Sequence, residues 1–194
     1  MQVLYKSILF LFLIFGTQST LAELQRGLSL NIDEQQRSYD LFIPDNKPNS
    51  KRPLVIMFHG YSGNSDLMTG ESNKRSPYKL WLKLAQQNNF LVAAPNGMLG
   101  SENKPGWNDC RADSISNPDY DDVNFTLKLI KKIKKEYSVD PRRIYATGTS
   151  NGGNMVIRLA MEVPEIFAAV APIVASNPYH SECMERVSLS QYSL

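Results

Sequence analysis

Apolar and polar residues follow one another in blocks along the chain, and several apolar blocks are typical of β-strands. Residues 37–44 are rich in β-favouring side chains that partly alternate with polar ones. Four later blocks are almost continuously apolar, as expected of strands buried on both faces of a sheet. These blocks lie at residues 54–58, 90–94, 144–147 and 168–174. The pattern therefore predicts a strand at each of these places.

Between the strands, apolar residues recur at helical spacing. Residues 78–87 carry one such stripe and residues 152–163 carry another. A further helix begins at Asp121-Asp122, where two acids favour the positive helix end, and stops before Asp140-Pro141. Its predicted apolar stripe is Val123, Leu127, Ile130, Ile133 and Tyr137. The order of elements predicts an α/β fold with a mostly parallel sheet, right-handed crossovers and helices on both faces.

Composition places the chain among ordinary globular proteins and excludes some functions. The 194 residues are 42% hydrophobic and 21% charged, with a net charge of +2. This balance argues against a dedicated nucleic-acid binder. The one dense basic cluster, residues 131–135, lies on a predicted helix and is interpreted as a solvated face. Two histidines and two cysteines that are far apart predict neither a metal site nor a cofactor site.

The first 22 residues have the pattern of a secretory signal. Lys6 supplies a positive charge, and residues 8–15 form an apolar segment too short to span a bilayer comfortably. Small residues up to Ala22 suit a signal peptidase. We expect cleavage after Ala22 and export to the periplasm or medium, with no membrane segment left. The alternative is an uncleaved membrane anchor.

After the predicted signal, the chain divides into a domain and a tail. Residues 23–175 hold the α/β pattern, whereas residues 176–194 are short, polar and aperiodic. Export would permit Cys110 and Cys183 to form a disulfide bond. The sequence leaves open whether their Cα atoms come close enough.

The most specific motif follows the predicted strand at residues 144–147. Gly148-Thr149-Ser150-Asn151-Gly152 matches G-x-S-x-G between a buried strand and a helix, which is typical of a nucleophile elbow. In such a turn the serine hydroxyl is exposed and strained, and the flanking glycines avoid collisions. We predict that Ser150 is the nucleophile of an acyl-transfer reaction. The amide of Asn151 is placed to bind a developing oxyanion.

A second loop is expected to complete the oxyanion hole. His59-Gly60-Tyr61 ends the predicted strand at residues 54–58, and we assign the second oxyanion amide to Tyr61. The alternative is a simple glycine turn. His59 itself is interpreted as structural support at the strand end rather than as the catalytic base.

Residues 100–120 are polar and rich in turn residues, so we expect a long excursion there. Trp107 within it is either a wall of the substrate pocket or a local packing anchor. Asp121 and Asp122 are interpreted as helix-capping acids rather than catalytic ones.

Together these residues resemble a known family. Residues 37–175 are similar to secreted esterases of the polyhydroxybutyrate depolymerase and feruloyl esterase group, which have the α/β-hydrolase fold. The resemblance is carried by PLVIMFHGYSGN at 53–64, GWN at 106–108, DDV at 121–123 and VDPRRIYATGTSNGG at 139–153. It implies a serine hydrolase that acts on a polyester or on a phenolic or acyl ester. Ser150 would be its nucleophile, and Tyr61 and Asn151 its oxyanion donors.

The sequence departs from that family after the serine. The triad acid and histidine of an α/β-hydrolase follow the nucleophile, but here only 44 residues follow Ser150 and none is an aspartate. His180 is the one downstream histidine and is interpreted as a surface residue rather than a substitute base. We therefore expect a domain without the last strands of the fold, with weak or no activity by itself. The alternatives are a non-catalytic secreted binding protein and an acyltransferase.

Overall fold

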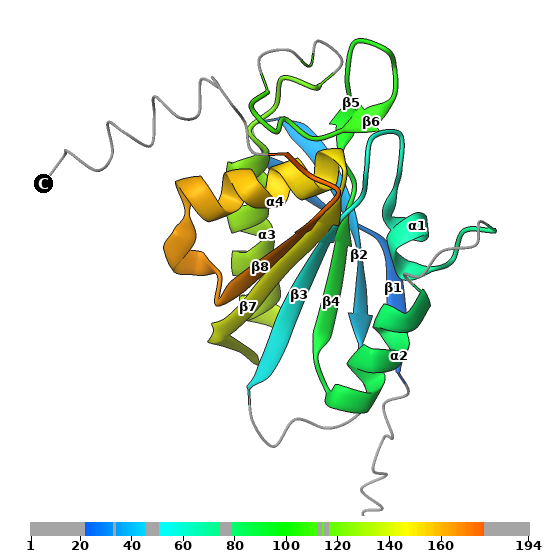
Figure 1. Cartoon of the computed structure of the whole chain (residues 1–194). Coiled ribbons are helices and arrows are strands. Elements are labelled where there is room, and N and C mark those ends of the chain that lie inside the picture. Colours follow the sequence, from blue (N-terminus) through cyan, green and yellow to red (C-terminus); the bar gives the residue numbers. More distant parts are fainter. Residues whose placement is uncertain are drawn as a thin grey trace, which may run out of the picture.

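The computed structural model describes residues 22–32, 34–45, 51–73, 79–111, 114 and 117–176. These residues build one six-stranded sheet (Figure 1) and one small two-stranded sheet. In spatial order the large sheet contains β1 (Glu23–Ile32), β2 (Gln35–Ile43), β4 (Leu91–Pro95), β3 (Arg52–Phe58), β7 (Val139–Thr149) and β8 (Ala169–Ile173). Strands β4, β3, β7 and β8 run parallel, and β1 and β2 form an antiparallel hairpin at one edge.

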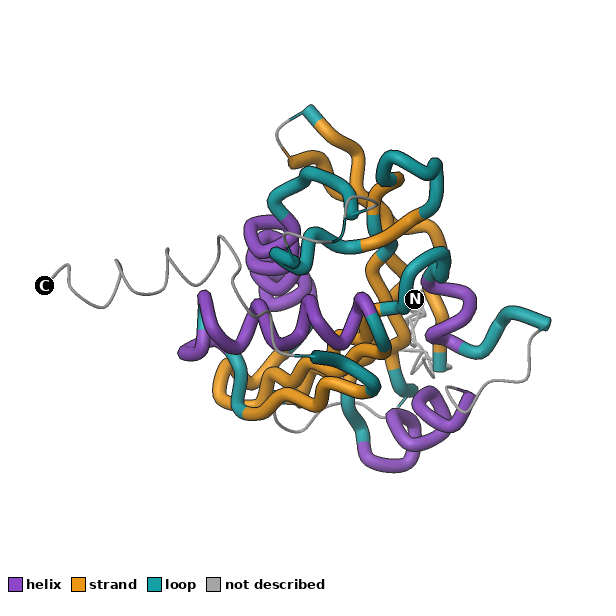
Figure 2. The backbone as a smooth tube through the Cα atoms, turned by 45° about the horizontal axis from the view of Figure 1, so that its top comes forward, coloured by secondary structure: helices purple, strands orange, loops and turns teal. Residues whose placement is uncertain are grey.

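Helices lie on both sides of this sheet (Figure 2). The remaining elements are α1 (Ser65–Thr69), α2 (Lys79–Asn88), β5 (Met98–Leu99), β6 (Pro105–Gly106), α3 (Asp122–Glu136), α4 (Asn151–Glu162) and the 3-10 helix η1 (Pro164–Ile166). Alternate residues of β3 point to opposite faces. Leu54 and Ile56 join the core beneath α3 and α4, whereas Val55 and Met57 join the core beneath α1 and α2. The observed sheet confirms the predicted mostly parallel α/β architecture.

Some local predictions need correction. The strand β1 was missed, although Leu28, Leu30 and Ile32 alternate there with polar residues. The short helix α1 was also missed. In α3 the fully buried positions include Phe125 and Leu129, which the predicted stripe omits, whereas Leu127 is only partly buried.

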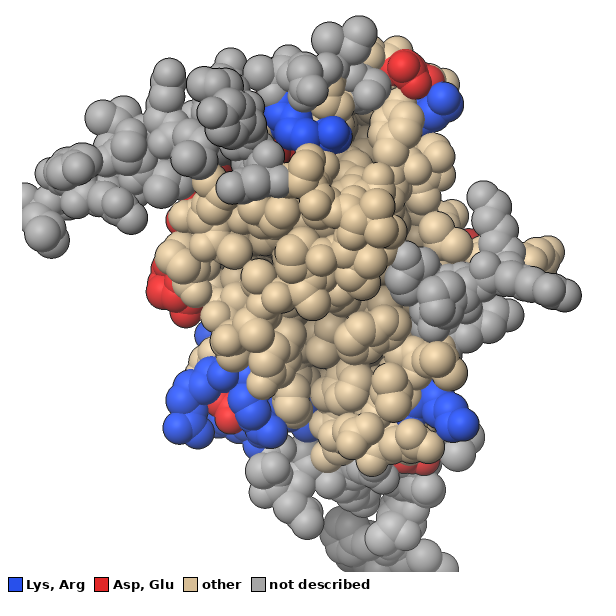
Figure 3. Space-filling view, viewed as in Figure 1, with Lys and Arg blue, Asp and Glu red and all other residues tan. Residues whose placement is uncertain are grey.

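The largest correction concerns β8, which was expected to be buried on both faces. It is an edge strand, and Ala169, Ala171, Pro172 and Ile173 are exposed. Around it the surface is uncharged in the middle of the view in Figure 3 and charged only near the margins. The continuous apolar run therefore predicted the strand correctly but not its burial, because β8 lies at the edge of the sheet.

The predictions for the signal segment, the tail, His180 and Cys183 fall partly or wholly outside the described residues. Cys110 is disulfide-bonded, and Cys183 is the only other cysteine in the sequence. None of the described helices has the length and apolar character that a membrane crossing requires.

Candidate active site

The carboxyl ends of the parallel strands meet at one edge of the sheet, and Ser150 lies there between β7 and α4. Its backbone has φ 55° and ψ −124°, a positive φ that non-glycine residues rarely adopt. Its N–H donates to the carbonyl of Ile173 at 2.9 Å, and its own carbonyl accepts from the N–H of Asn154 at 2.9 Å. The residue is exposed. The structure thus shows the strained strand-to-helix turn that the motif predicts.

The two motif glycines allow the backbone to approach closely at this turn. A Cβ on Gly148 would lie 2.4 Å from the carbonyl oxygen of Gly152. A Cβ on Gly152 would lie 2.3 Å from the carbonyl oxygen of Phe58, at the end of β3. Any side chain at either position would therefore collide with main-chain atoms, which explains the G-x-S-x-G spacing.

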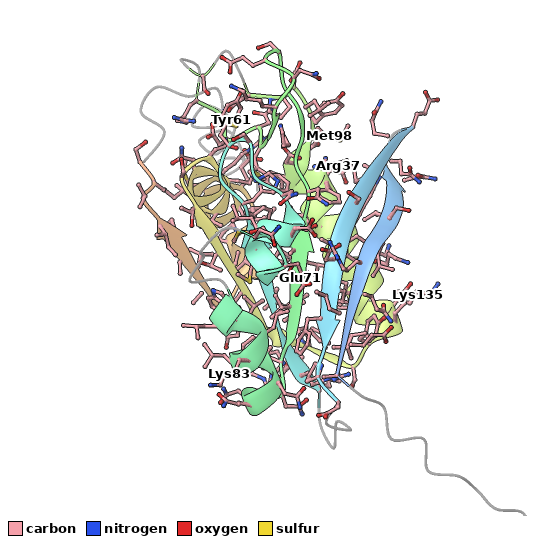
Figure 4. The ribbon with its side chains drawn as sticks, turned by 90° about the vertical axis from the view of Figure 1, so that its right-hand side faces the viewer. Arg37, Tyr61, Glu71, Lys83, Met98 and Lys135 are labelled. Carbon is pink, nitrogen blue, oxygen red and sulfur yellow. The ribbon has the colours of Figure 1, made fainter. Side chains whose placement is uncertain are left out.

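The loop after β3 passes beside the elbow. A Cβ on Gly60 would lie 3.6 Å from the Cβ of Ser150, so Tyr61 follows directly after this close approach. Figure 4 shows Tyr61 and Met98 at the same end of the sheet, with Lys83 at the other end. The Tyr61 hydroxyl donates to Glu102 Oε2 at 2.9 Å, which ties the loop to the segment between β5 and β6.

Asn151, the first residue of α4, is held by its side chain. Its Oδ1 accepts from the Trp107 N–H at 2.8 Å, and its Nδ2 donates to the Trp107 carbonyl at 3.0 Å. The first N–H groups of a helix have no partner within that helix and lie at its positive end. The backbone amide of Asn151 is therefore fixed next to Ser150, where the sequence predicted an oxyanion donor.

The short strand β6 connects the two predicted oxyanion residues. The N–H of Ser62 donates to the carbonyl of Pro105 at 2.8 Å. A Cβ on Gly106 would lie 3.2 Å from Asn151 Oδ1 and also 3.2 Å from Cδ2 of Tyr61. Sequence reasoning missed this role of Gly106, because only the fold brings the three segments together.

Trp107 is a packing anchor and not a wall of the pocket, which corrects one of the two interpretations of this residue. Its side chain is fully buried. The indole Nε1 donates to the carbonyl of His59 at 2.8 Å, and the ring centroid lies 5.0 Å from that of Phe58 and 4.9 Å from that of His59. A ring with no exposed surface has no area to offer a substrate.

His59 is structural, as predicted. Its Nε2 accepts from the N–H of Gly97 at 2.9 Å, so the ring proton is assigned to Nδ1, which donates to the Gly60 carbonyl at 2.7 Å. Burial lowers the pKa of His59 to about 4. The ring is therefore neutral, and both nitrogens are used to hold the loops after β3 and β4.

Two acids at the start of α3 have different roles. Asp121 caps the helix, because its Oδ1 accepts from the N–H of Asn124 at 2.9 Å. Asp122 is fully buried and forms an ion pair of 2.6 Å with Arg37. Its Oδ2 accepts from the N–H of Asn108 at 2.7 Å. Burial raises the pKa of Asp122 against the opposing effect of Arg37. Only Asp121 is the predicted cap, and Asp122 instead anchors the excursion to β2.

Nothing in the described part of the chain groups three or more metal-ligating side chains. The downstream histidine, His180, lies outside the described residues. The described site therefore consists of an exposed serine on a strained backbone, the first turn of α4 that follows it, and the loop after β3, which approaches it at Gly60.

The sequence model of the prolyl oligopeptidase family matches residues 78–182. Feruloyl esterase B of Piromyces equi is 34% identical over 122 residues, which are 62% of this chain and 20% of that protein. The poly(3-hydroxybutyrate) depolymerase of Ralstonia pickettii is 28% identical over 127 residues, 63% of this chain and 25% of that protein. A thermostable esterase of known structure is 26% identical with a TM-score of 0.53, covering 75% of this chain and 40% of that one.

These matches confirm the predicted similarity to polyhydroxybutyrate depolymerases and feruloyl esterases and the α/β-hydrolase fold. In each case this chain spans less than half of the relative's own length.

Proposed function

The chain belongs to the prolyl oligopeptidase family, and from that premise we propose that it is a carboxylic ester hydrolase with Ser150 as its nucleophile. The backbone of Ser150 carries this proposal. A serine at φ 55° and ψ −124°, exposed between a parallel strand and a helix, is placed for attack on a bound carbonyl.

The chemistry begins with attack of Ser150 Oγ on the ester carbonyl carbon while a base takes the hydroxyl proton. The carbonyl oxygen becomes an anion, and the backbone amides of Tyr61 and Asn151 stabilise it. Collapse of this intermediate expels the alcohol and leaves an acyl group on Ser150. Attack by water then releases the acid and restores the hydroxyl.

The base is not His59. Its Nε2 already accepts a backbone hydrogen bond, and its ring is fully buried. We therefore propose that a base other than His59 takes the proton of Ser150, and that turnover is weak where no such base is supplied.

The same observation favours a second candidate, a binding protein that keeps the esterase fold without turnover. A neutral, fully hydrogen-bonded His59 supplies no base to Ser150 in the described site. Such a protein would bind to a polyester or a phenolic ester without hydrolysing it.

The relatives suggest the substrate class, which we propose to be a polyester or a phenolic or acyl ester. Hydrolysis of p-nitrophenyl acetate tests the reaction, with Ser150→Ala compared with the wild type. Ser138→Ala is the matched control, because Ser138 is exposed and precedes the opposite end of β7. A wild-type rate no higher than that of Ser150→Ala would contradict the enzyme proposal, and retention on polyhydroxybutyrate granules without turnover would favour the binding protein.

We further propose export, on the strength of Lys6, the apolar residues 8–15 and Ala22. Mass spectrometry of the protein from a secreting host should find Glu23 as the first residue. Protein that retains Met1 in the membrane fraction would contradict cleavage and support the anchor.

A further inference from the structure

A carboxylate that sequence reasoning overlooked lies beneath the candidate oxyanion hole. Asp109 is fully buried, just after Trp107 in the excursion between β6 and α3. Its Oδ2 accepts from Asn151 Nδ2 at 2.7 Å and from Asn154 Nδ2 at 3.2 Å. Asn151 and Asn154 are three residues apart in the first turn of α4, so both face the same carboxylate.

The remaining contacts of Asp109 come from its own loop. Its Oδ1 accepts from Asn117 Nδ2 at 2.6 Å and from the Arg111 N–H at 3.2 Å. The Arg111 guanidinium lies 3.0 Å from Oδ2. A buried carboxylate with these partners is hydrogen-bonded and paired, so its charge is compensated.

This arrangement determines how the amide of Asn151 is turned. Nδ2 must face the Asp109 carboxylate, which only accepts hydrogen bonds, so Oδ1 must face the Trp107 N–H. The side chain of Asn151 is thereby held at both Oδ1 and Nδ2. A rotation that turned the backbone amide of Asn151 away would break these contacts. Asn154 connects Asp109 to the segment just beyond β8, because its Nδ2 donates to Asp109 and its Oδ1 accepts from the Ser176 N–H at 2.9 Å.

We propose that Asp109 is a positioning residue for the oxyanion hole and acts through the side chain of Asn151. This inference rests on the proposed ester hydrolysis. It assigns to Asp109 no contact with substrate. Its role is to keep the Asn151 backbone amide aimed at the space beside Ser150, so it stabilises the transition state more than the bound ester.

The test replaces Asp109 by Asn, which keeps the volume but removes the charge and one acceptor. Loss of a whole oxyanion donor costs about 10²- to 10³-fold in kcat, and we expect Asp109→Asn to lower kcat by about tenfold or more while KM stays within about twofold. The control is Asp140→Asn at the far end of β7. Asp140 likewise accepts from a nearby backbone N–H, of Arg142 at 3.0 Å, and from an arginine, Arg143 Nε at 3.0 Å.

If the role of Asp109 were purely structural, Asp109→Asn and Asp140→Asn would both lower stability, and Asp109→Asn would show no selective fall in kcat at constant KM. A kcat for Asp109→Asn equal to that of Asp140→Asn would overturn the proposal. Failure of the proposed function has a different signature, because Ser150→Ala would then match the wild type. In that case the positioning role in catalysis falls with the function, and the side-chain amide signals of Asn151 test by NMR only whether Asp109 holds that side chain: unchanged hydrogen exchange in Asp109→Asn would overturn this hold as well.

A second variant keeps the test open if Asp109→Asn does not fold. Asn151→Ala retains the backbone donor and removes the side chain through which Asp109 acts. We expect its kcat to fall by about tenfold or more. We also expect the double variant to be no worse than Asn151→Ala, because coupled residues are not additive. An unchanged kcat in Asn151→Ala, or additive losses in the double variant, would contradict action through Asn151.

Discussion

The N–H of Ser150 donates a 2.9 Å hydrogen bond to the carbonyl of Ile173, so the end of β8 holds the strained serine from one side. The first turn of α4 holds it from the other side, through Asn154. An edge strand with an exposed surface therefore contributes to the geometry of the candidate site.

The close backbone approach at the elbow predicts a large stability difference between two glycine substitutions. Gly148→Ala places a Cβ 2.4 Å from a carbonyl oxygen, and we expect it to lower the free energy of unfolding by about 3 kcal/mol or more. Gly27→Ala is the control, because nothing lies within 4 Å and only its positive φ opposes a side chain. Holding an alanine at this positive φ costs about 1–2 kcal/mol, so we expect a loss of that size in Gly27→Ala. Urea unfolding measures both, and equal losses would show that the elbow tolerates a side chain.

The buried indole predicts a stability effect without a specificity effect. Trp107→Phe removes the hydrogen bond to the His59 carbonyl, and we expect a loss of about 1–3 kcal/mol in the free energy of unfolding. The ratio of kcat/KM between acetate and butyrate esters should stay the same, because the ring has no exposed surface. A changed ratio with unchanged stability would restore the pocket-wall interpretation.

Burial of His59 predicts that acid destabilises the fold. Burial lowers the pKa from 6.5 to about 4, so between these values the unfolded chain binds a proton that the folded chain does not. The free energy of unfolding should therefore fall as pH decreases, by roughly 1.4 kcal/mol per pH unit in this window.

His59→Gln is the reference for that measurement, because it removes the titrating ring. Burial raises the pKa of Asp122, which favours the folded state as pH falls, but this carboxyl is present in both proteins. Parallel curves of stability against pH for the two proteins would contradict a neutral buried His59.

His59 does not serve as the base for Ser150, which predicts chemical rescue by an external base. Since both nitrogens of His59 are hydrogen-bonded within the fold, added imidazole should accelerate hydrolysis of p-nitrophenyl acetate by the wild type beyond its effect on Ser150→Ala. His180→Ala should leave the rate of hydrolysis measured without imidazole unchanged. A large loss in His180→Ala, with no response to imidazole, would identify His180 as the base.

The sequence predicted the parts of the fold that local pattern determines. The parallel strands, the helices α2, α3 and α4, and the turn at Ser150 all follow from apolar periodicity and from the glycine spacing. Exposure of β8 did not follow, because an apolar run does not say what covers it. Likewise Trp107 was left between two roles, since burial depends on Phe58 and His59, which are distant in sequence.

The contacts that organise the site were beyond prediction for the same reason. Asp109 and Asn151 are 42 residues apart, and nothing in a single sequence pairs them. Gly106 belongs to a turn-rich stretch and to the GWN motif of the resemblance, but neither predicts that it lies between Tyr61 and Asn151, as the fold shows.

Covalent labelling with a fluorophosphonate tests the central claim most directly, because this reagent phosphonylates an exposed, activated serine and needs no turnover. We predict a single adduct on the peptide that contains Ser150, absent from Ser150→Ala and retained in Ser138→Ala. An unmodified Ser150 peptide in folded protein, or an adduct on another serine, would contradict the account.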